Sequence, residues 1–288
     1  MITSVTKYNN FKPYKNKAVS MIENIKKNWS VYLMEASGLA GFVLFAGLLS
    51  IFLEHPELPV MKSELQNYPL IRRVPLGIIL GVYIAIVVLA FGKKSGAHIN
   101  PSATWTFYRL SKINLQQALI YTIAQFAGAI GAAQLLKYAM GDFFSHPIIN
   151  YGVTEPKPPH GTMTAFIAEF IISFILMLVL LIASSSKKFE KKVPLITGIL
   201  IAVYLIIEIP FSGMSLNPAR SFGGALAANK WEHLWIYFVS PTLAMLAASE
   251  VFVSWKIKQF RNTNSSSYTS KTPEDYKEIP KYPIIEPA

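Results

Sequence analysis

Two short segments, far apart in the chain, each place an asparagine and a proline between long apolar stretches. They are residues 96–102 and 213–220. An Asn side-chain carbonyl caps a helix by accepting a free backbone N–H of its first turn, and Pro is favoured at the first helical position. Asn100-Pro101 and Asn217-Pro218 therefore each predict the start of a helix. Each also leaves an Asn amide group free to donate hydrogen bonds.

The N-terminus of a helix carries a partial positive charge of about half an elementary charge. Two such ends, each with an Asn amide donor, would donate hydrogen bonds to an oxygen atom that passes between them. A single Asn-Pro pair is more often an ordinary turn. Two pairs in matching apolar surroundings instead predict two half-helices that meet inside a membrane and form a polar site there.

The composition predicts an all-α membrane protein. Of the 288 residues, 52% are hydrophobic and 15% are charged, and the mean hydropathy is +0.36. Apolar segments of roughly 17–25 residues are long enough to span a bilayer. We expect six transmembrane helices, over residues 32–53, 75–91, 115–140, 163–183, 193–211 and 234–255. The helices after the Asn-Pro pairs, over 101–108 and 218–228, are too short to span and must re-enter the membrane against protein.

The basic residues predict the topology and the domain limits. Lys and Arg gather in the first 30 residues and in residues 93–94, 187–192 and 256–261, which lie on one side if six helices cross. Both termini are therefore expected in the cytoplasm. We expect a tail over 1–30, a channel domain over 31–256 with repeats over 31–140 and 162–256, and a disordered tail over 257–288. The lack of a secretory signal and the short loops favour a bacterial inner membrane.

The charge and the cysteine count limit the remaining classes. The net charge of +11 comes from residues that flank apolar spans, which predicts contact with anionic lipid and no binding of nucleic acid. The chain has no Cys, so it has no disulfide, thiol nucleophile or Cys-ligated metal. No catalytic grouping, metal site or cofactor is expected. His98, beside the first Asn-Pro pair, is expected to line a pore or order its loop.

The two halves of the chain repeat the same order of elements. Each has a span with an early Glu, a second span, an Asn-Pro half-helix and a third span. Because three spans is an odd number, the second repeat must enter from the opposite side of the membrane, so the repeats are inverted. Glu35 and Glu169 are expected to accept backbone N–H groups of the nearby loops. The alternative is that each marks a wrongly placed span end.

These features resemble the aquaporin and aquaglyceroporin (major intrinsic protein) family. The likeness covers about residues 31–255 and includes Arg220, residues 124–128 (AQFAG) and residues 235–241 (WIYFVSP). It implies a channel for water and small uncharged solutes, and a homotetramer with four pores. The central constriction would consist of Asn100, Pro101, Ser102, Asn217, Pro218 and Ala219. The first motif departs from the family in having Ser102 where Ala is usual, which adds a hydroxyl near the constriction.

The resemblance also implies an outer selectivity filter. Counted without gaps from the two motifs, it consists of Leu80, Leu205, Met214 and Arg220. Such a filter has one charge and three apolar side chains, and lacks the His of a water-selective filter and the aromatic pair of a glycerol filter. A slip of one residue would replace Leu205 by Tyr204. The alternative is that these residues face lipid or the core. Glu208 is expected either to support the loop before Arg220 or to lie at the membrane interface.

Other classes fit less well. A secondary transporter also uses broken helices and inverted repeats, but it needs acidic or carbonyl sites for coupling ions at the midplane. A cation channel needs rings of carbonyls or carboxylates, which positive helix ends oppose. A closed or structural member of the same fold remains as an alternative, because a pore can be blocked while both motifs are kept.

Overall fold

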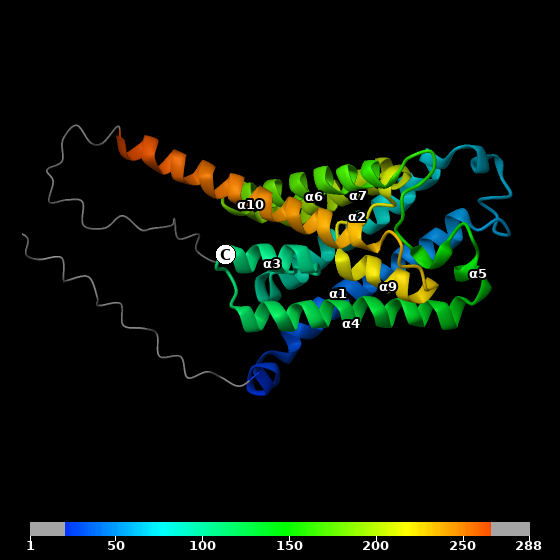
Figure 1. Ribbon diagram of the computed structural model, residues 1–288, viewed down its shortest axis with the longest axis horizontal. Helices are drawn as coiled ribbons and strands as arrows, with labels where there is room; N and C mark the ends of the chain where they lie inside the picture. The colour runs from blue at the N-terminus through cyan, green and yellow to red at the C-terminus, as the bar shows by residue number, and fades with distance from the viewer. Residues whose placement is uncertain (1–20, 266–288) are drawn as a thin grey trace, which may run out of the picture.

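The computed structural model describes residues 21–265, and the outer parts of both predicted tails lie outside the described residues. The described part contains helices and no strand. Its long helices run side by side along the long axis of the molecule (Figure 1). The start of α1 and the end of α10 lie at the same end of this axis. The long helices are α1 (Met21–Glu54), α2 (Pro69–Ser95), α4 (Leu115–Met140), α6 (Thr162–Ser184), α7 (Val193–Ile207) and α10 (Leu234–Ser265).

Several short elements connect these helices. The half-helices are α3 (Pro101–Arg109) and α9 (Pro218–Ala228), which begin at the prolines of the two Asn-Pro pairs as predicted. The other short elements are α5 (Asp142–Ser145), α8 (Ile209–Ser212) and three 3₁₀ turns, η1 (Glu64–Asn67), η2 (Asn150–Gly152) and η3 (Glu190–Lys192).

Five of the six predicted spans are long and apolar enough to cross a membrane by length and composition; these are α1, α2, α4, α6 and α10. The fifth predicted span, over 193–211, is divided. Its helix α7 has 15 residues and is followed at once by the short α8. Pro210 explains the break, because it lacks the N–H that would bond to Ile206 and its ring clashes with the preceding turn. Packed closely on α2, α7 completes the set of long helices.

The helices extend beyond the predicted limits of the channel domain, so residues 31 and 256 do not mark helix ends. The first helix begins at Met21, inside the predicted tail, and bends at Asn28, where φ is −117° and ψ is 18°. Its first turns are held by side chains: Tyr32 Oη donates to Asn24 Oδ1 at 2.8 Å, and Asn24 Nδ2 donates to Gln116 at 3.0 Å. These bonds stabilise helix where apolar content does not. At the other end, α10 continues to Ser265.

The two repeats pack as a related pair. In the first repeat α1 packs on α4, in the second α6 packs on α10, and α2 meets α7 across the middle. Each half-helix packs extensively on the third long helix of the other repeat, α3 on α10 and α9 on α4. Figure 1 shows α3 and α9 between the long helices, pointing to opposite ends of the molecule. This arrangement confirms the predicted fold of spanning helices with two re-entrant half-helices.

Polar side chains of α4, the least apolar predicted span, have partners inside the protein. Lys137 Nζ donates to the carbonyl of Ala227 at 2.8 Å and lies 5.3 Å from the centre of the Tyr151 ring. It therefore places a positive charge at the C-terminal end of α9, where the helix dipole favours one. Gln125 is fully buried and bonds to Glu35. These contacts keep both groups away from lipid, as the cost of burying them requires.

Small residues permit the closest helix contacts. A Cβ atom added at Gly128 on α4 would overlap the backbone of Ala36 on α1. One added at Gly81 or Gly198 would lie 2.5 Å from the carbonyl oxygen of the other, across the contact between α2 and α7. Gly131, on the same helix as Gly128, has nothing within 4 Å of its added Cβ. Close neighbours surround the added Cβ at Gly41, Gly77, Gly81, Gly128, Gly198 and Gly224.

Two glycines of the same helix provide a matched test of this packing. We expect Gly128→Ala to lower the free energy of unfolding by about 2 kcal/mol, because the added methyl forces α1 and α4 apart. Gly131→Ala should be neutral or stabilising by up to about 1 kcal/mol, because Ala is the better helix former. Unfolding of the detergent-solubilised variants, followed by circular dichroism, measures both. Equal stability of the two variants would contradict the packing described here.

Candidate functional site

The site is built around a reciprocal pair of hydrogen bonds between the two repeats. Asn100 Nδ2 donates to the carbonyl of Leu216 at 2.7 Å, and Asn217 Nδ2 donates to the carbonyl of Ile99 at 2.8 Å. Each Asn thus bonds to the residue that precedes the other. The two segments, more than one hundred positions apart in the chain, are joined tip to tip.

Each Asn also caps its own half-helix. Asn100 Oδ1 accepts from Ser102 N at 2.9 Å, and Asn217 Oδ1 accepts from Ala219 N at 3.0 Å and from Arg220 N at 3.3 Å. Each amide group has two N–H bonds, and one of them is used in the bond to the opposite loop. The expectation of a wholly free amide was therefore too simple. One N–H of each Asn has no partner among the described residues.

The two loops before the Asn residues share one backbone conformation. Gly96 and Gly213 have φ of 87° and 81°, Ala97 and Met214 have φ of 48° and 52°, and Ile99 and Leu216 have φ of 40° and 61°. Positive φ is unfavourable for residues with a side chain, and most of all for a β-branched residue such as Ile99. Such a conformation persists only where the surrounding contacts hold it, at a cost of roughly 1–3 kcal/mol per residue.

Buried carboxyl groups supply those contacts. Glu35 on α1 accepts from the backbone N–H groups of His98, at 3.0 Å, and Ile99, at 2.6 Å. Glu169 on α6 accepts in the same way from Ser215, at 2.6 Å, and Leu216, at 2.8 Å. Both carboxyl groups are fully buried. The structure thus places both Glu residues against the loops rather than at span ends.

Hydrogen-bond counting assigns the tautomer of His98. Thr104 Oγ1 donates to the carbonyl of Asn100 at 3.0 Å and accepts from Gln125 Nε2 at 3.0 Å. Its remaining contact is with His98 Nδ1 at 3.2 Å, so Nδ1 carries the proton and Nε2 is an acceptor. The imidazole ring also stacks on Phe107, with ring centres 4.5 Å apart. This network orders the first loop and fixes the ring of His98.

The hydroxyl of Ser102 contacts the other repeat. Ser102 Oγ lies 2.8 Å from Thr242 Oγ1 on α10, and Ser102 is only 1% exposed. The extra hydroxyl of the first motif therefore joins α3 to the other repeat. In this bond either hydroxyl can be the donor.

A cavity of about 160 Å³ leads to the Asn pair. Its lining includes both loops, Phe107 on α3, and Ser184 and Val193 at the ends of α6 and α7. His98, Asn100, Asn217 and Met214 also line it. Its walls are mainly apolar, and its polar lining includes Ser184 and Thr197 as well as the groups near the Asn pair.

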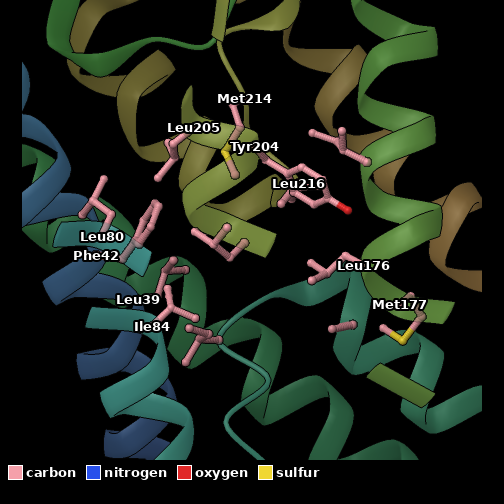
Figure 2. Close-up of a cluster of buried hydrophobic side chains, with 14 of the residues drawn as sticks. Leu39, Phe42, Leu80, Ile84, Leu176, Met177, Tyr204, Leu205, Met214 and Leu216 are labelled. Atoms are coloured by element: carbon pink, nitrogen blue, oxygen red, sulfur yellow. The ribbon is translucent and has the colours of Figure 1, made fainter. Parts of the chain in front are cut away.

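Three of the four predicted filter residues lie in one apolar cluster. Leu80, Leu205 and Met214 are almost fully buried and belong to one apolar cluster. Figure 2 shows Leu80 and Leu205 on one side of this cluster, whereas the ring of Tyr204 points the other way. Of the four, Met214 alone lines the cavity of about 160 Å³. The Arg220 side chain has no hydrogen bond or ion pair within residues 21–265, and its Nη1 atom is buried.

The comparisons with known proteins identify the family. The sequence model of the family described as "Major intrinsic protein" matches residues 26–252, which is most of the chain. The chain belongs to the major intrinsic protein family. Because members of this family are channels, the match points away from an enzyme. Together with the apolar helices, it makes the chain an integral, multi-pass membrane protein.

Individual relatives agree with this family. Aquaporin NIP3-1 of Oryza sativa subsp. japonica is 35% identical over 179 residues, which cover 62% of this chain and 56% of the relative. Aquaporin NIP1-1 of Arabidopsis thaliana is 30% identical over 237 residues, which cover 80% of this chain and 76% of the relative. The chain thus matches little more than half the length of the rice protein. Both relatives are from plants and give the expected bacterial inner membrane no support.

A solved structure shares the fold. The X-ray structure of the aquaglyceroporin from Plasmodium falciparum superposes with a TM-score of 0.62 at 20% identity. The match covers 77% of this chain and 93% of the other. At this identity the likeness establishes the arrangement of helices and leaves the solute open.

A row of hydroxyl groups, which was not predicted from the sequence, supports the second motif of this major intrinsic protein. Thr154 Oγ1 lies 2.6 Å from Ser221 Oγ, which lies 2.5 Å from Ser215 Oγ. Ser215 Oγ in turn donates to the carbonyl of Asn217 at 3.0 Å. This row of hydroxyl groups links the loop before α6 to the helix cap of α9. Nothing in the spacing of these residues signals it, because the contact depends on how the loop folds back.

The bond between Ser102 and Thr242 gives a prediction for the departing motif. We expect Ser102→Ala and Thr242→Val each to lower the free energy of unfolding by about 1 kcal/mol, because each removes one partner of the hydrogen bond between the two hydroxyl groups. The double variant should lose less unfolding free energy than the two single variants lose together, and the difference, the coupling energy, should be about 1 kcal/mol. Unfolding of the four proteins in detergent measures this cycle. Strictly additive effects would show that the two hydroxyl groups do not interact.

Proposed function

We propose that this protein is a channel for passive permeation of water and small neutral solutes such as glycerol, urea or hydrogen peroxide. The observation that carries the proposal is the reciprocal Asn pair. It sets two half-helix N-termini and two unpaired amide N–H groups at the inner end of a cavity. A solute oxygen can accept from both amides there, and no covalent chemistry is required.

The same geometry supports exclusion of protons and ions. Two positive helix ends and Arg220 oppose the entry of a cation. Two Asn donors orient the oxygen of a passing water toward them, so a single file of water cannot keep the uniform hydrogen-bond direction that proton transfer needs. The constriction residues in this proposal are Asn100, Pro101, Ser102, Asn217, Pro218 and Ala219, supported by His98, Glu35 and Glu169.

The outer filter in this proposal consists of Leu80, Leu205, Met214 and Arg220. Met214, which lines the cavity, and the guanidinium of Arg220, which has no partner among the described residues, support it. Arg220 would donate to a hydroxyl or carbonyl oxygen, while the apolar side chains contact the carbon face of the solute. We therefore propose modest water flow with passage of small neutral solutes.

The proposed setting is a lipid membrane with both termini in the cytoplasm and four chains in a homotetramer. The common end of α1 and α10 and the basic segments near it support the orientation. Many large apolar side chains on the outward faces of the long helices remain exposed in the single chain. Lipid and neighbouring copies would cover them. The channel domain of the proposal spans residues 31–256, with repeats over 31–140 and 162–256.

Reconstituted vesicles test the channel and its selectivity. In stopped-flow light scattering we expect them to shrink in a sucrose gradient faster than empty vesicles, and to re-swell in glycerol or urea as the solute enters. Leu205→His should slow glycerol entry by about tenfold relative to water, because a polar ring narrows an apolar filter; a difference of about 1.4 kcal/mol corresponds to this factor. Leu205→Ile, which keeps the filter apolar, is the control. Fast water flow with complete rejection of glycerol by the unchanged protein would contradict the proposed filter.

The charge of Arg220 gives a second prediction. Arg220→Val should raise the Na⁺ leak through a planar bilayer by roughly tenfold or more, because a unit positive charge beside a narrow pore repels cations by over 1 kcal/mol. Arg109→Val removes a charge that is exposed and paired with Glu250 at 2.9 Å, and should leave the leak unchanged. An equal, low leak in both variants would exclude Arg220 as the filter charge.

A further inference from the structure

Ser212 lies between two buried carboxyl groups. Its Oγ atom contacts Glu169 Oε1 at 2.6 Å and also hydrogen-bonds to Glu208 Oε1. The backbone N–H of Met214 donates to Ser212 Oγ at 3.1 Å. All three side chains are at most 4% exposed. One hydroxyl group thus connects α6, the end of α7 and the loop that leads to Asn217.

Proton counting shows that one carboxyl group must be protonated. A serine hydroxyl has one proton to donate and two lone pairs that can accept. Met214 N–H takes one lone pair, so the hydroxyl proton can go to only one of the two carboxyl groups. The other carboxyl group must bring a proton of its own and donate it to Ser212 Oγ. Two ionised carboxylates around this hydroxyl would leave one of them facing a lone pair.

The contacts of the two carboxyl groups assign the proton to Glu208. Glu169 also accepts the backbone N–H groups of Ser215 and Leu216, so donors surround both of its oxygens. This environment suits an ionised carboxylate. Glu208 Oε2, in contrast, is buried and has no hydrogen-bond partner within the described residues. Burying an ionised oxygen without a partner costs far more than burying a neutral one.

Charge balance agrees with this assignment. Among the described residues, Arg220 and Tyr237 are the other ionisable side chains that interact electrostatically with Glu208 and Glu169. With Glu208 neutral, the buried set holds one positive charge, Arg220, and one negative charge, Glu169. A second negative charge would have no counter-charge here, and it would attract Arg220 away from the pore.

We infer that Glu208 is a neutral carboxylic acid that donates to Ser212, and that it acts as a positioning residue for the loop before Asn217. Through Ser212 the acid holds the N–H of Met214, the filter residue that lines the cavity. Being neutral, it leaves the guanidinium of Arg220 unpaired and available to a solute. With 4% of its surface exposed, Glu208 is buried against protein. The effect on permeation rests on the proposed channel function, but the protonation state does not.

Infrared spectroscopy of the reconstituted protein at neutral pH tests the protonation state directly. We expect a carbonyl band of a protonated carboxylic acid that is lost in Glu208→Gln and is kept in Glu169→Gln. Glu250→Gln, which changes an exposed carboxylate on α10, is the matched control and should keep the band. Persistence of the full band in Glu208→Gln, its loss in Glu169→Gln instead, or its absence from the unchanged protein would each overturn the inference.

Permeation measurements test the positioning role. A Gln amide at position 208 can donate to Ser212 as the acid does, so Glu208→Gln should keep water and glycerol permeability within about twofold. Glu208→Ala removes the donor and should lower the permeability by about tenfold, roughly the effect of one lost buried hydrogen bond. Size-exclusion profiles check that both variants fold. A loss in Glu208→Gln equal to that in Glu208→Ala would show that a charge is needed and overturn the inference. If the unchanged protein does not conduct at all, the channel proposal fails while the infrared result still stands.

Discussion

The fold depends on satisfying backbone polar groups where the chain is not helical at membrane depth. A spanning helix bonds all of its own N–H and C=O groups, but the two loops before Asn100 and Asn217 cannot. They are held by groups that come from elsewhere in the protein. In each loop, two backbone N–H groups donate to a buried carboxyl group, and one carbonyl accepts from the amide of the opposite Asn. These bonds allow residues with side chains to keep positive φ angles inside the bundle.

The two repeats reach this result with different side chains. In the first, Gln125 and Thr104 surround Glu35 and fix the ring of His98. In the second, Ser212 bridges Glu169 to Glu208, and hydroxyl groups reach from Thr154 to the cap of α9. The backbone is therefore nearly symmetric while the support is not. The second loop, which carries Met214 and leads to Arg220, has the additional acidic group.

The sequence predicts the long helices and the centre of the site because both follow from local patterns. The helix over Leu115–Met140 and the half-helix over Pro218–Ala228 have the predicted limits, since apolar length and Asn-Pro caps determine them. The break at Pro210 and the early start at Met21 were missed. The first depends on one proline in an apolar run, and the second on side-chain bonds to another helix. The partner of Ser102 depends on a contact between the repeats. The position of Glu208 depends on contacts between elements of the second repeat. No spacing in the chain reveals either contact.

In the proposed channel, opposed Asn donors and helix ends pass water while they interrupt proton transfer. The most direct test follows water and protons in the same vesicles, with light scattering for volume and an enclosed pH-sensitive dye for protons. We expect rapid shrinkage under a sucrose gradient, with a proton leak under an imposed pH gradient no greater than that of empty vesicles. Shrinkage accompanied by fast proton entry, or no shrinkage beyond that of empty vesicles, would contradict it.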